Sequence, residues 1–348
     1  MTARAGAADL EAVARSVLGE YPVEPGAGLT LLSLSENAVF AVDEPGGRRT
    51  VLRLHRPGYR SPQEILSELA WVRALGAEGS VPVPDVLPAR DGRLLVPGHA
   101  RDAVRFAWVD GEHPAGAAPD GDAGAGRLVP DFEVLGAVAA RLHAHARRWT
   151  PPAGFTRGRW DATGILGPGD GLPGTWGHWR GGIGVGPAET EVLAALETEL
   201  RRRLARYGTD PDRFGLVHAD MRLANLLVER ASGRVTVIDF DDCGYGWFGY
   251  DAGAAVSFME HDPAVPALLD AWSRGYRTVA PLSADDEAEL GTFVLLRRLL
   301  LIAWLGSRPD ADPARELGAD YTRTGCDLAE RFLTGASYRS SNAASSRT

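Results

Sequence analysis

The segment HADMRLANLLVERASGRVTVIDFDD, residues 218–242, surrounds two short apolar runs with a histidine, an asparagine and several aspartates. Its runs NLLVER and RVTVIDF flank the tripeptide ASG, a pattern typical of a β-hairpin with a three-residue loop whose Gly233 is left-handed. Counting outward from this loop predicts that Asn225 lies opposite Asp239, with α carbons about 4.5 to 5.5 Å apart. An amide oxygen and a carboxylate oxygen placed in this way suit Mg²⁺, which keeps sites for substrate phosphates and water.

Asp220 lies five residues before Asn225, on the loop that leads into the hairpin. It can reach the same space without binding the metal, and this is the place of a catalytic base in phosphoryl transfer. His218 is expected to brace the loop. An isolated aspartate is more often a turn or cap residue, which is the alternative for Asp220 and for Asp239. The joint spacing of these residues favours the catalytic interpretation.

His218-Ala219-Asp220 with Asn225, followed by the segment 238–241, resembles the catalytic loop and metal-binding segment of the aminoglycoside phosphotransferase and choline kinase-like family. The resemblance extends from about Leu29 to the helix that contains Leu299. It implies a fold similar to that of protein kinases, with ATP or GTP as phosphoryl donor. It also implies that Asp241 either helps to hold a second Mg²⁺ or reinforces the negative field.

The predicted fold class is therefore α+β with two lobes. A small antiparallel-sheet lobe with a leading helix is expected over residues 1–110, and a larger, mostly helical lobe over residues 111–336. Residues 337–348 are small and polar, which predicts a disordered tail. The Gly/Ala/Pro-rich stretch 111–126 is expected to connect the lobes flexibly.

Runs rich in β-formers at 29–34, 39–42 and 50–54 predict an antiparallel meander in the first lobe. The stretches VPVPDVLPARDGRLLV and AVRFAWVDGEHP predict two further strands. Between the meander and these strands, Ser61 and Glu64 form the pattern of a capping box, and Gly76 is expected to close the helix.

Arg53 lies in a predicted strand where the family pattern has lysine. Glu68 lies at the edge of the apolar stripe of the following helix, and a half-buried acid needs a partner. We therefore expect an Arg53–Glu68 ion pair that orients nucleotide phosphates. The alternative is a solvated Glu68. Arginine for lysine is not a conservative change, because guanidinium is broader and binds through two donors.

Two short stretches stand where the resemblance implies contacts with the nucleotide. In SLSENAVF, which replaces a strict glycine-rich loop, Ser33, Ser35 and Asn37 are expected to bind phosphate. In VRFAWV, Phe106 and Trp108 approach the hinge that meets the base.

Asp239 and Asp251 are separated by eleven residues, which leaves no room for a long regulated activation segment. Ala219 stands where phosphorylation-controlled kinases carry an arginine. Both features favour a small hydroxylated acceptor over a protein. Asp251 by itself reads as a helix N-cap, and the resemblance implies that it also braces the catalytic loop.

Side chains that could meet the acceptor include Arg222, which either contacts the transferring phosphate or is a surface charge. An amine-bearing acceptor could be bound by a set of acids, namely Asp241, Asp242, Glu260 and Asp262. Aromatic surfaces are offered by Trp160, Trp176 and Trp179, although ordinary packing is at least as frequent. His143 and His145 fall inside a predicted helix over 131–149 and are expected to be packed.

The 348 residues carry a net charge of −9, which argues against nucleic acid or an anionic membrane as partner. Cys243 and Cys326 are far apart, which suggests neither a disulfide framework nor a zinc site. The N-terminal residues predict a short helix rather than a targeting segment, and a cytoplasmic location is expected. The apolar run at 293–306 is too short to span a bilayer and predicts a buried helix.

These observations predict Mg²⁺-dependent transfer of the γ-phosphate of ATP or GTP to a hydroxyl group of a small molecule, such as an aminoglycoside or another amine-bearing metabolite. The resemblance also admits a homoserine-type amino-alcohol kinase and a bacterial stress-response protein Ser/Thr kinase. An alternative of another class is a nucleotide-binding regulator without activity. Arg53 in place of lysine speaks for the regulator, whereas intact Asp220, Asn225 and Asp239 speak against it.

Overall fold

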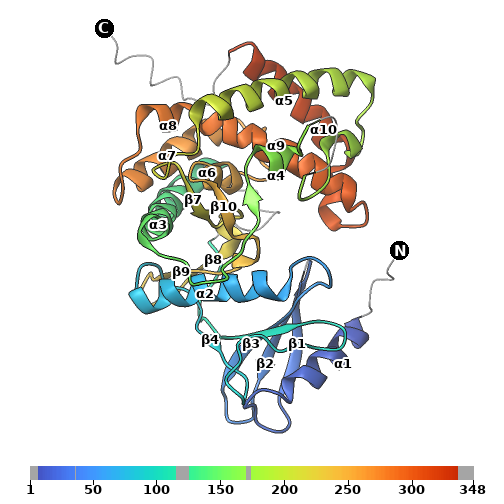
Figure 1. Cartoon of the computed structure of the whole chain (residues 1–348), viewed down its shortest axis with the longest axis vertical. Helices are drawn as coiled ribbons and strands as arrows, with labels where there is room; N and C mark the ends of the chain where they lie inside the picture. Colours follow the sequence, from blue (N-terminus) through green and yellow to red (C-terminus); the bar gives the residue numbers. More distant parts are fainter. Residues whose placement is uncertain (1–6, 36, 115–124, 170–173, 336–348) are drawn as a thin grey trace. The chain divides into compact units, whose positions relative to one another are not determined.

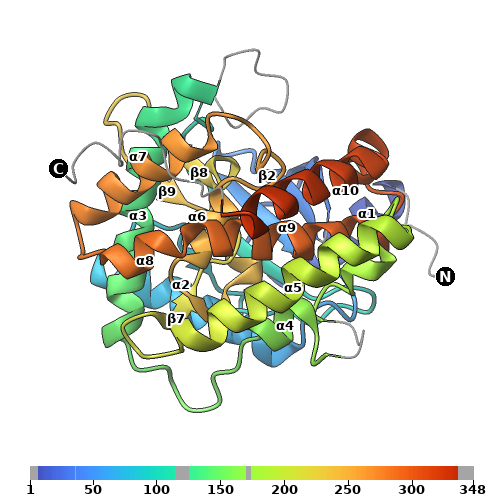
Figure 2. The ribbon, with the colours of Figure 1, turned by 90° about the horizontal axis from the view of Figure 1, so that it is seen from above.

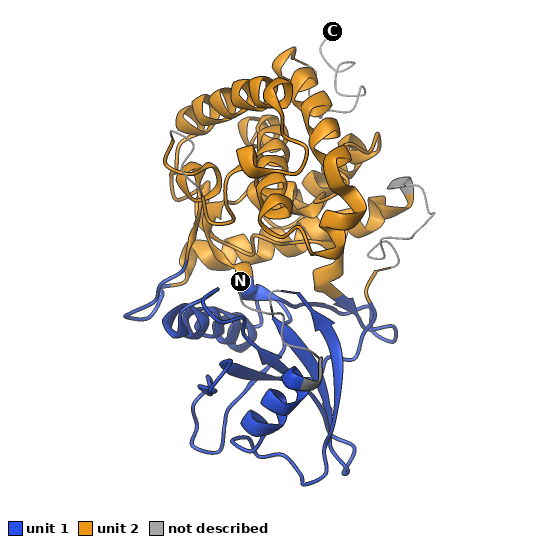
Figure 3. Cartoon of the chain, turned by 90° about the vertical axis from the view of Figure 1, so that its right-hand side faces the viewer, with its two compact units in different colours: residues 1–112, 150–157, 227–241 blue, residues 113–149, 158–226, 242–348 orange. Residues whose placement is uncertain are grey.

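A computed structural model describes residues 7–35, 37–114, 125–169 and 174–335. The chain divides into two compact units, shown in different colours in Figure 3. Unit 1 comprises residues 1–112, 150–157 and 227–241, and unit 2 comprises residues 113–149, 158–226 and 242–348. The predicted tail at 337–348, and residues 115–124 of the predicted connection, lie outside the described residues.

The first segment of unit 1 ends at residue 112, close to the expected boundary at residue 110. Unit 1 also contains segments 150–157 and 227–241, which were expected in the second lobe. Backbone pairing explains the difference. Val237 N–H donates to Pro82 O at 2.9 Å, and Glu112 and Val228 exchange two backbone hydrogen bonds. Thr156 N–H donates to Ser67 Oγ at 2.9 Å. Segments 150–157 and 227–241 are therefore parts of unit 1.

The sheet of unit 1 is antiparallel, with strand order β1-β2-β3-β5-β4 (Figure 1). Its strands are β1 (Gly28–Leu34), β2 (Ala38–Asp43), β3 (Arg49–Leu54), β4 (Val86–Leu87) and β5 (Ala103–Ala107). The predicted meander is confirmed. The stretch VPVPDVLPARDGRLLV contributes only the two-residue strand β4 and an isolated bridge from Val96 to Ala103, because its prolines cannot donate to a ladder.

The helices of unit 1 are α1 (Ala7–Leu18) and α2 (Pro62–Glu78). The predicted capping box is confirmed, since Glu64 N–H donates to Ser61 Oγ and Ser61 N–H donates to Glu64 Oε2. The predicted end at Gly76 is wrong. The helix ends at Glu78, and the next residue, Gly79, caps it with a left-handed φ of 64°, the conformation that closes a helix at low cost.

Alternation along β3 gives the two faces of this sheet different partners. Leu52 and Leu54 belong to the apolar cluster that α1 covers. Arg53 points to the opposite face, where its neighbour Val104 on β5 packs with residues of α2. Figure 1 shows α1 and α2 on either side of the strands. The sheet therefore presents Arg53 towards α2.

Unit 2 is mostly helical. Its helices are α3 (Val129–Arg148), α4 (Ala162–Leu166), α5 (Pro187–Tyr207), α6 (Tyr250–Ala255), α7 (Val265–Arg277), α8 (Ala284–Ala288), α9 (Leu290–Ser307) and α10 (Asp312–Leu333), with short 3₁₀ turns η2 (Ala125–Leu128), η3 (Trp179–Gly181) and η4 (Leu223–Asn225). A small sheet has the order β6-β10-β7, from β6 (Arg159–Trp160), β7 (Phe214–Val217) and β10 (Gly244–Trp247). The predicted α+β class is confirmed.

Helix α9 lies at the centre of unit 2, beside α5, α6 and α10 (Figure 2). Among the described residues it is the helix long and apolar enough to cross a membrane, but 78% of that segment is buried inside the protein. Arg297 and Arg298, in its middle, are 2% and 0% exposed. The predicted buried helix is confirmed. It extends from Leu290 to Ser307 and is therefore longer than the apolar run at 293–306.

The hairpin of the opening segment consists of β8 (Leu226–Val228) and β9 (Val235–Val237). Glu229 N–H donates to Arg234 O at 3.0 Å, and Gly233 N–H donates to Glu229 O at 2.8 Å. Gly233 has the predicted left-handed φ, 70°. The loop nevertheless holds four residues, 230–233, so the predicted three-residue loop is wrong. The register shifts by one, and the count that set Asn225 opposite Asp239 loses its basis.

Candidate active site

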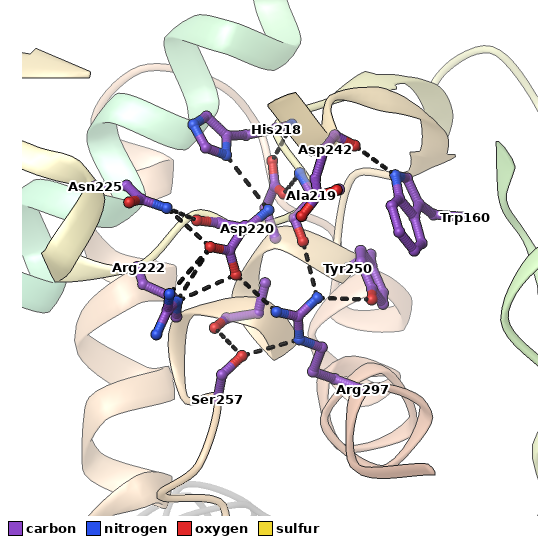
Figure 4. A network of polar contacts seen from close by, with 12 residues as sticks. Trp160, His218, Ala219, Asp220, Arg222, Asn225, Asp242, Tyr250, Ser257 and Arg297 are labelled. Atoms are coloured by element: carbon purple, nitrogen blue, oxygen red, sulfur yellow. Dashed lines mark hydrogen bonds and ion pairs between the residues drawn. The ribbon is translucent and has the colours of Figure 1, made fainter. Parts of the chain in front are cut away.

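Asp220 lies on the loop after β7 in unit 2, and three side chains converge on its carboxylate (Figure 4). Arg297 Nη2 donates to Oδ1 at 2.7 Å and Arg222 Nε donates to Oδ1 at 3.1 Å. Asn225 Nδ2 donates to Oδ2 at 2.9 Å. Burial alone would raise the pKa of Asp220, but Arg222 and Arg297 outweigh it and lower the pKa to about 2. The carboxylate is therefore ionised at neutral pH.

Arg297 was not among the predicted site residues. Besides Asp220, it donates to Ala219 O at 3.1 Å and to Ser257 Oγ at 2.9 Å. Burial alone would lower its pKa, but Tyr250 and Asp220 raise it. The signal in the sequence was an arginine inside an apolar helix, because a buried guanidinium requires an anionic partner. The sequence did not identify that partner.

Asp251 braces the catalytic loop, as the resemblance implied. Its Oδ1 accepts from Ala219 N–H at 2.8 Å, and its Oδ2 accepts from His218 N–H at 3.2 Å. The prediction that it caps a helix is wrong, since the N-cap of α6 is Gly249 and Asp251 lies within the first turn. Its side chain points to the loop instead. Ala219 has a φ of 66°, which an alanine adopts only when its surroundings hold it there.

His143 extends this brace. It is fully buried, as predicted, with Nε2 2.9 Å from Asp251 Oδ2 and Nδ1 3.2 Å from Tyr276 Oη. Burial lowers the pKa of His143 despite the neighbouring carboxylate. His218 also acts locally, because its Nδ1 accepts from Asp220 N–H at 3.3 Å. Both histidines thus shape the loop.

Asn225 is 6% exposed and uses its amide nitrogen twice, towards Asp220 O at 2.7 Å and Asp220 Oδ2 at 2.9 Å. Its amide oxygen makes no hydrogen bond within the described part of the chain. This orientation fits an oxygen ligand for a metal ion.

The predicted pair of Arg53 and Glu68 in unit 1 is confirmed, with Arg53 Nη2 2.6 Å from Glu68 Oε1. Glu68 is 1% exposed, so the solvated alternative is wrong. Burial would lower the pKa of Arg53, but Glu68, Asp241 and Asp239 raise it. Arg53 Nε and Glu68 Oε2 are buried and make no hydrogen bond to the described residues. Such unsatisfied atoms fit a site that a polar ligand completes.

Asp239 lies beside this pair, with Oδ1 4.0 Å from Arg53 Nη1, and 55% of its side chain is exposed. Its φ of 63° is left-handed, a backbone state that clusters at functional sites. An exposed carboxylate next to a guanidinium fits a divalent cation that also binds phosphate.

Asp241 is buried beside basic side chains. Its Oδ1 lies 3.7 Å from His55 Nδ1, and Arg157 Nη2 donates to its backbone oxygen. Burial would raise the pKa of Asp241, whereas Arg53 lowers it. Burial and Arg53 lower the pKa of His55 to about 3, so this ring is neutral. These contacts favour the electrostatic interpretation of Asp241, and its role as a metal ligand stays a prediction.

The residues predicted to contact the nucleotide lie in two places, the turn after β1 and the end of β5. Their contacts with a nucleotide stay predictions, and their side chains differ in exposure and in partners. Asn37 is buried, and its Oδ1 accepts from Arg56 N–H at 3.1 Å, so this side chain holds the turn. Ser35, in contrast, is exposed. The Phe106 ring lies 5.1 Å from Arg53 Cζ, on the face that α2 covers, and Trp108 stacks under Arg49 at 3.9 Å.

Two acids predicted to bind an amine have other partners. Glu260 Oε2 lies 2.7 Å from Arg298 Nη1, and both side chains are fully buried. The expectation that Glu260 meets an acceptor is therefore wrong. Asp262 Oδ1 accepts from Ala264 N–H at 2.7 Å.

The tryptophans predicted as possible stacking surfaces are packed instead. Trp160, Trp176 and Trp179 are 2%, 6% and 1% exposed. Trp160 Nε1 donates to Asp242 O at 2.7 Å, which fixes the backbone at the start of β10 (Figure 4). These rings stabilise unit 2 rather than form an open surface.

Comparison with known proteins agrees with this geometry. A solved structure of a microcompartment-associated aminopropanol kinase is 45% identical, with a TM-score of 0.84 over 94% of this chain and 99% of that one. A structure of an amicoumacin kinase in complex with AMP-PNP, Ca²⁺ and Ami has a TM-score of 0.72, covers 94% of both chains and is 22% identical, which shows a shared fold.

An uncharacterized protein of Deinococcus radiodurans is 30% identical over 315 residues, which are 88% of this chain and 84% of that protein. The profile of the phosphotransferase enzyme family matches residues 29–290. The predicted resemblance is thus confirmed, and the chain belongs to the phosphotransferase enzyme family.

Proposed function

We propose that this chain transfers the γ-phosphoryl group of ATP, with Mg²⁺ bound, to the hydroxyl group of a small amino alcohol. Phosphoryl transfer to a hydroxyl group of a small molecule is the activity of its family and of its named kinase relatives. The observation that carries the choice of acceptor is the 45% identity to an aminopropanol kinase over nearly the whole of both chains. ATP as the donor, Mg²⁺ as the metal ion and an amino alcohol as the acceptor are all parts of this proposal.

Asp220 is the group that would take the proton of the acceptor hydroxyl. The hydroxyl oxygen forms a bond to the γ-phosphorus, the bond from that phosphorus to the β,γ-bridging oxygen breaks, and its electron pair leaves with ADP. A carboxylate ionised at neutral pH can orient the hydroxyl and accept its proton as the new bond forms. Arg297 and Asp251 hold this carboxylate and its loop in place.

Each unit has residues suited to the nucleotide phosphates or the metal. Arg53, fixed by Glu68, is suited to the phosphates, and the exposed carboxylate of Asp239 and the free amide oxygen of Asn225 are suited to Mg²⁺. When bound, the metal ion would neutralise charge that develops on the phosphates. That Asn225 and Asp239 share one ion remains a prediction from the sequence, as does the cytoplasmic location.

The test is transfer from labelled ATP or GTP by the purified full chain with Mg²⁺, using a panel of aminopropanol, homoserine, an aminoglycoside and casein. We expect labelled phosphate on aminopropanol and not on casein. An Asp220→Asn variant should lose about 10²- to 10⁴-fold in kcat. Nucleotide protection of this variant against melting should be retained. Transfer to none of the acceptors, with nucleotide protection intact, would favour the regulator without activity.

A further inference from the structure

The carboxylate of Asp220 has no acceptor position left for a substrate hydroxyl. A carboxylate offers about four lone-pair positions. Oδ1 accepts from Arg297 Nη2 at 2.7 Å and from Arg222 Nε at 3.1 Å. Oδ2 accepts from Asn225 Nδ2 at 2.9 Å and from Arg222 Nη2 at 3.2 Å. A hydroxyl that is to lose its proton to Asp220 must therefore displace one of these donors.

Arg297 and Asn225 are fixed by further contacts. Arg297 is 2% exposed and also donates to Ala219 O and Ser257 Oγ. Asn225 is 6% exposed and donates to Asp220 O at 2.7 Å as well as to the carboxylate. Moving either one would leave buried polar groups without partners, which is costly.

Arg222 differs from both. A third of its side chain, 33%, is exposed, and within the described residues its side chain hydrogen-bonds to Asp220 alone. Its distances to the carboxylate are 3.1 to 3.3 Å, longer than the roughly 2.7 to 2.9 Å of strong charge-assisted hydrogen bonds. Figure 4 shows Arg222 and Arg297 approaching the carboxylate from two sides.

We propose that Arg222 is a latch that covers the catalytic carboxylate in the free enzyme and is displaced by the acceptor hydroxyl. The proposal rests on the proposed function, because it assigns to Asp220 the acceptor's proton. Arg297 and Asn225 stay in place and keep the carboxylate oriented. The guanidinium of Arg222 moves into solvent without leaving a buried group unpaired. Arg222 is thus a positioning residue that competes with the acceptor.

The test compares the wild type with Arg222→Gln and Arg222→Lys under saturating ATP and Mg²⁺, with Arg230→Gln as matched control. Arg230 is an exposed arginine, 81% by side chain, that pairs with Glu112 and not with the catalytic loop. Loss of the competing ion pair in Arg222→Gln should lower the KM for aminopropanol about fivefold. The KM of Arg222→Lys should lie between those of the wild type and Arg222→Gln, because an ammonium group cannot donate to both carboxylate oxygens as a guanidinium does. The control should match the wild type.

A second measurement separates a latch from a fixed support. In Arg222→Ala, millimolar guanidinium chloride should reoccupy the vacated place and inhibit competitively with aminopropanol, whereas the wild type should be insensitive. Activation by guanidinium, or an unchanged or raised KM in Arg222→Gln, would overturn the latch while the proposed function stands. Absence of turnover by the wild type with every acceptor would overturn both.

Discussion

Arg53 Nη2 lies 2.6 Å from Glu68 Oε1, and this buried pair joins β3 to α2 in unit 1. Lysine is usual at this position in the family pattern, but the pair is complete with arginine. Arginine also brings Nη1 to 4.0 Å from Asp239. One guanidinium can therefore meet two carboxylates, which a single ammonium does less well.

We predict that Glu68→Gln lowers both stability and nucleotide affinity. The change removes the buried carboxylate that pairs with Arg53 at 2.6 Å, which should reduce the free energy of unfolding by about 3 to 5 kcal/mol. The KM for ATP should rise at least about tenfold, because Arg53 is no longer oriented. The measurements are urea unfolding and initial rates.

Glu64→Gln on the same helix is the control, since Glu64 serves the capping box at the start of α2. It should change stability by less than about 0.5 kcal/mol, because glutamine also completes a capping box, and leave the KM for ATP unchanged. Equal nucleotide KM in the Glu68 variant and this control would contradict a role for the pair in nucleotide binding.

The catalytic loop and this ion pair could be predicted from the sequence because each depends on short spacings. Asp220 and Asn225 are five residues apart, and Glu68 follows from the apolar stripe of one helix. Arg297 could not be predicted, because it is 77 residues from Asp220 and reaches it only through the packing of α9 in unit 2. Long-range contacts of this kind leave no local pattern.

The predictions of the hairpin loop length and of a helix cap at Asp251 were wrong because both relied on local sequence rules. The loop of the β8–β9 hairpin could hold three or four residues, since a left-handed Gly233 suits both, and one residue changes every cross-strand pair. Asp251 has the position of a helix cap in the sequence. Its carboxylate instead binds the backbone of residues 218 and 219, because two buried N–H groups there need acceptors.

We predict that Asp239→Asn weakens dependence on Mg²⁺ without unfolding the protein. Asparagine tolerates a left-handed backbone, and the Asp239 side chain is 55% exposed, so stability should change by less than about 0.5 kcal/mol. The Mg²⁺ concentration for half-maximal rate should rise at least about tenfold, because a charged ligand is lost. Rates measured over a Mg²⁺ titration test this.

Asp43→Asn is the matched control for this prediction, because Asp43 is 50% exposed and also pairs with an arginine of β3, Arg49. The control should keep the wild-type Mg²⁺ dependence. If both variants shift alike, the effect is one of general surface charge and the assignment of Asp239 fails.

We predict that His143→Phe slows catalysis through the loop brace. The Asp251 carboxylate would lose its contact with His143 Nε2 while fully buried, which should cost about 1 to 3 kcal/mol of stability. The strained backbone at Ala219 should relax, and kcat should fall while the KM for ATP holds. His145→Phe, a buried change two residues along the same helix, should affect stability without this fall in kcat. A parallel loss of kcat in both variants would refute the brace.

We predict that Arg297→Met and Arg298→Met destabilise the protein alike but differ in catalysis. The two arginines are adjacent and buried in α9, and Arg297 pairs with Asp220 while Arg298 pairs with Glu260. Each change leaves a carboxylate without its buried partner, which should lower the free energy of unfolding by about 3 to 5 kcal/mol. Urea unfolding near neutral pH measures this common loss.

The pH dependence of kcat separates the two variants. The pKa of Asp220 is lowered to about 2, so its ion pairs stabilise the fold above the ordinary pKa of about 3.9, and this contribution is lost only as pH falls through about 2. Without Arg297, less positive charge opposes the effect of burial, so the pKa of Asp220 should be higher than in the wild type. The kcat of Arg297→Met should then fall towards about pH 5 and recover towards pH 8. In Arg298→Met, kcat per folded enzyme should follow the wild-type profile, because Asp220 keeps its donors. A flat profile for Arg297→Met would show that Arg297 does not control the ionisation of the base.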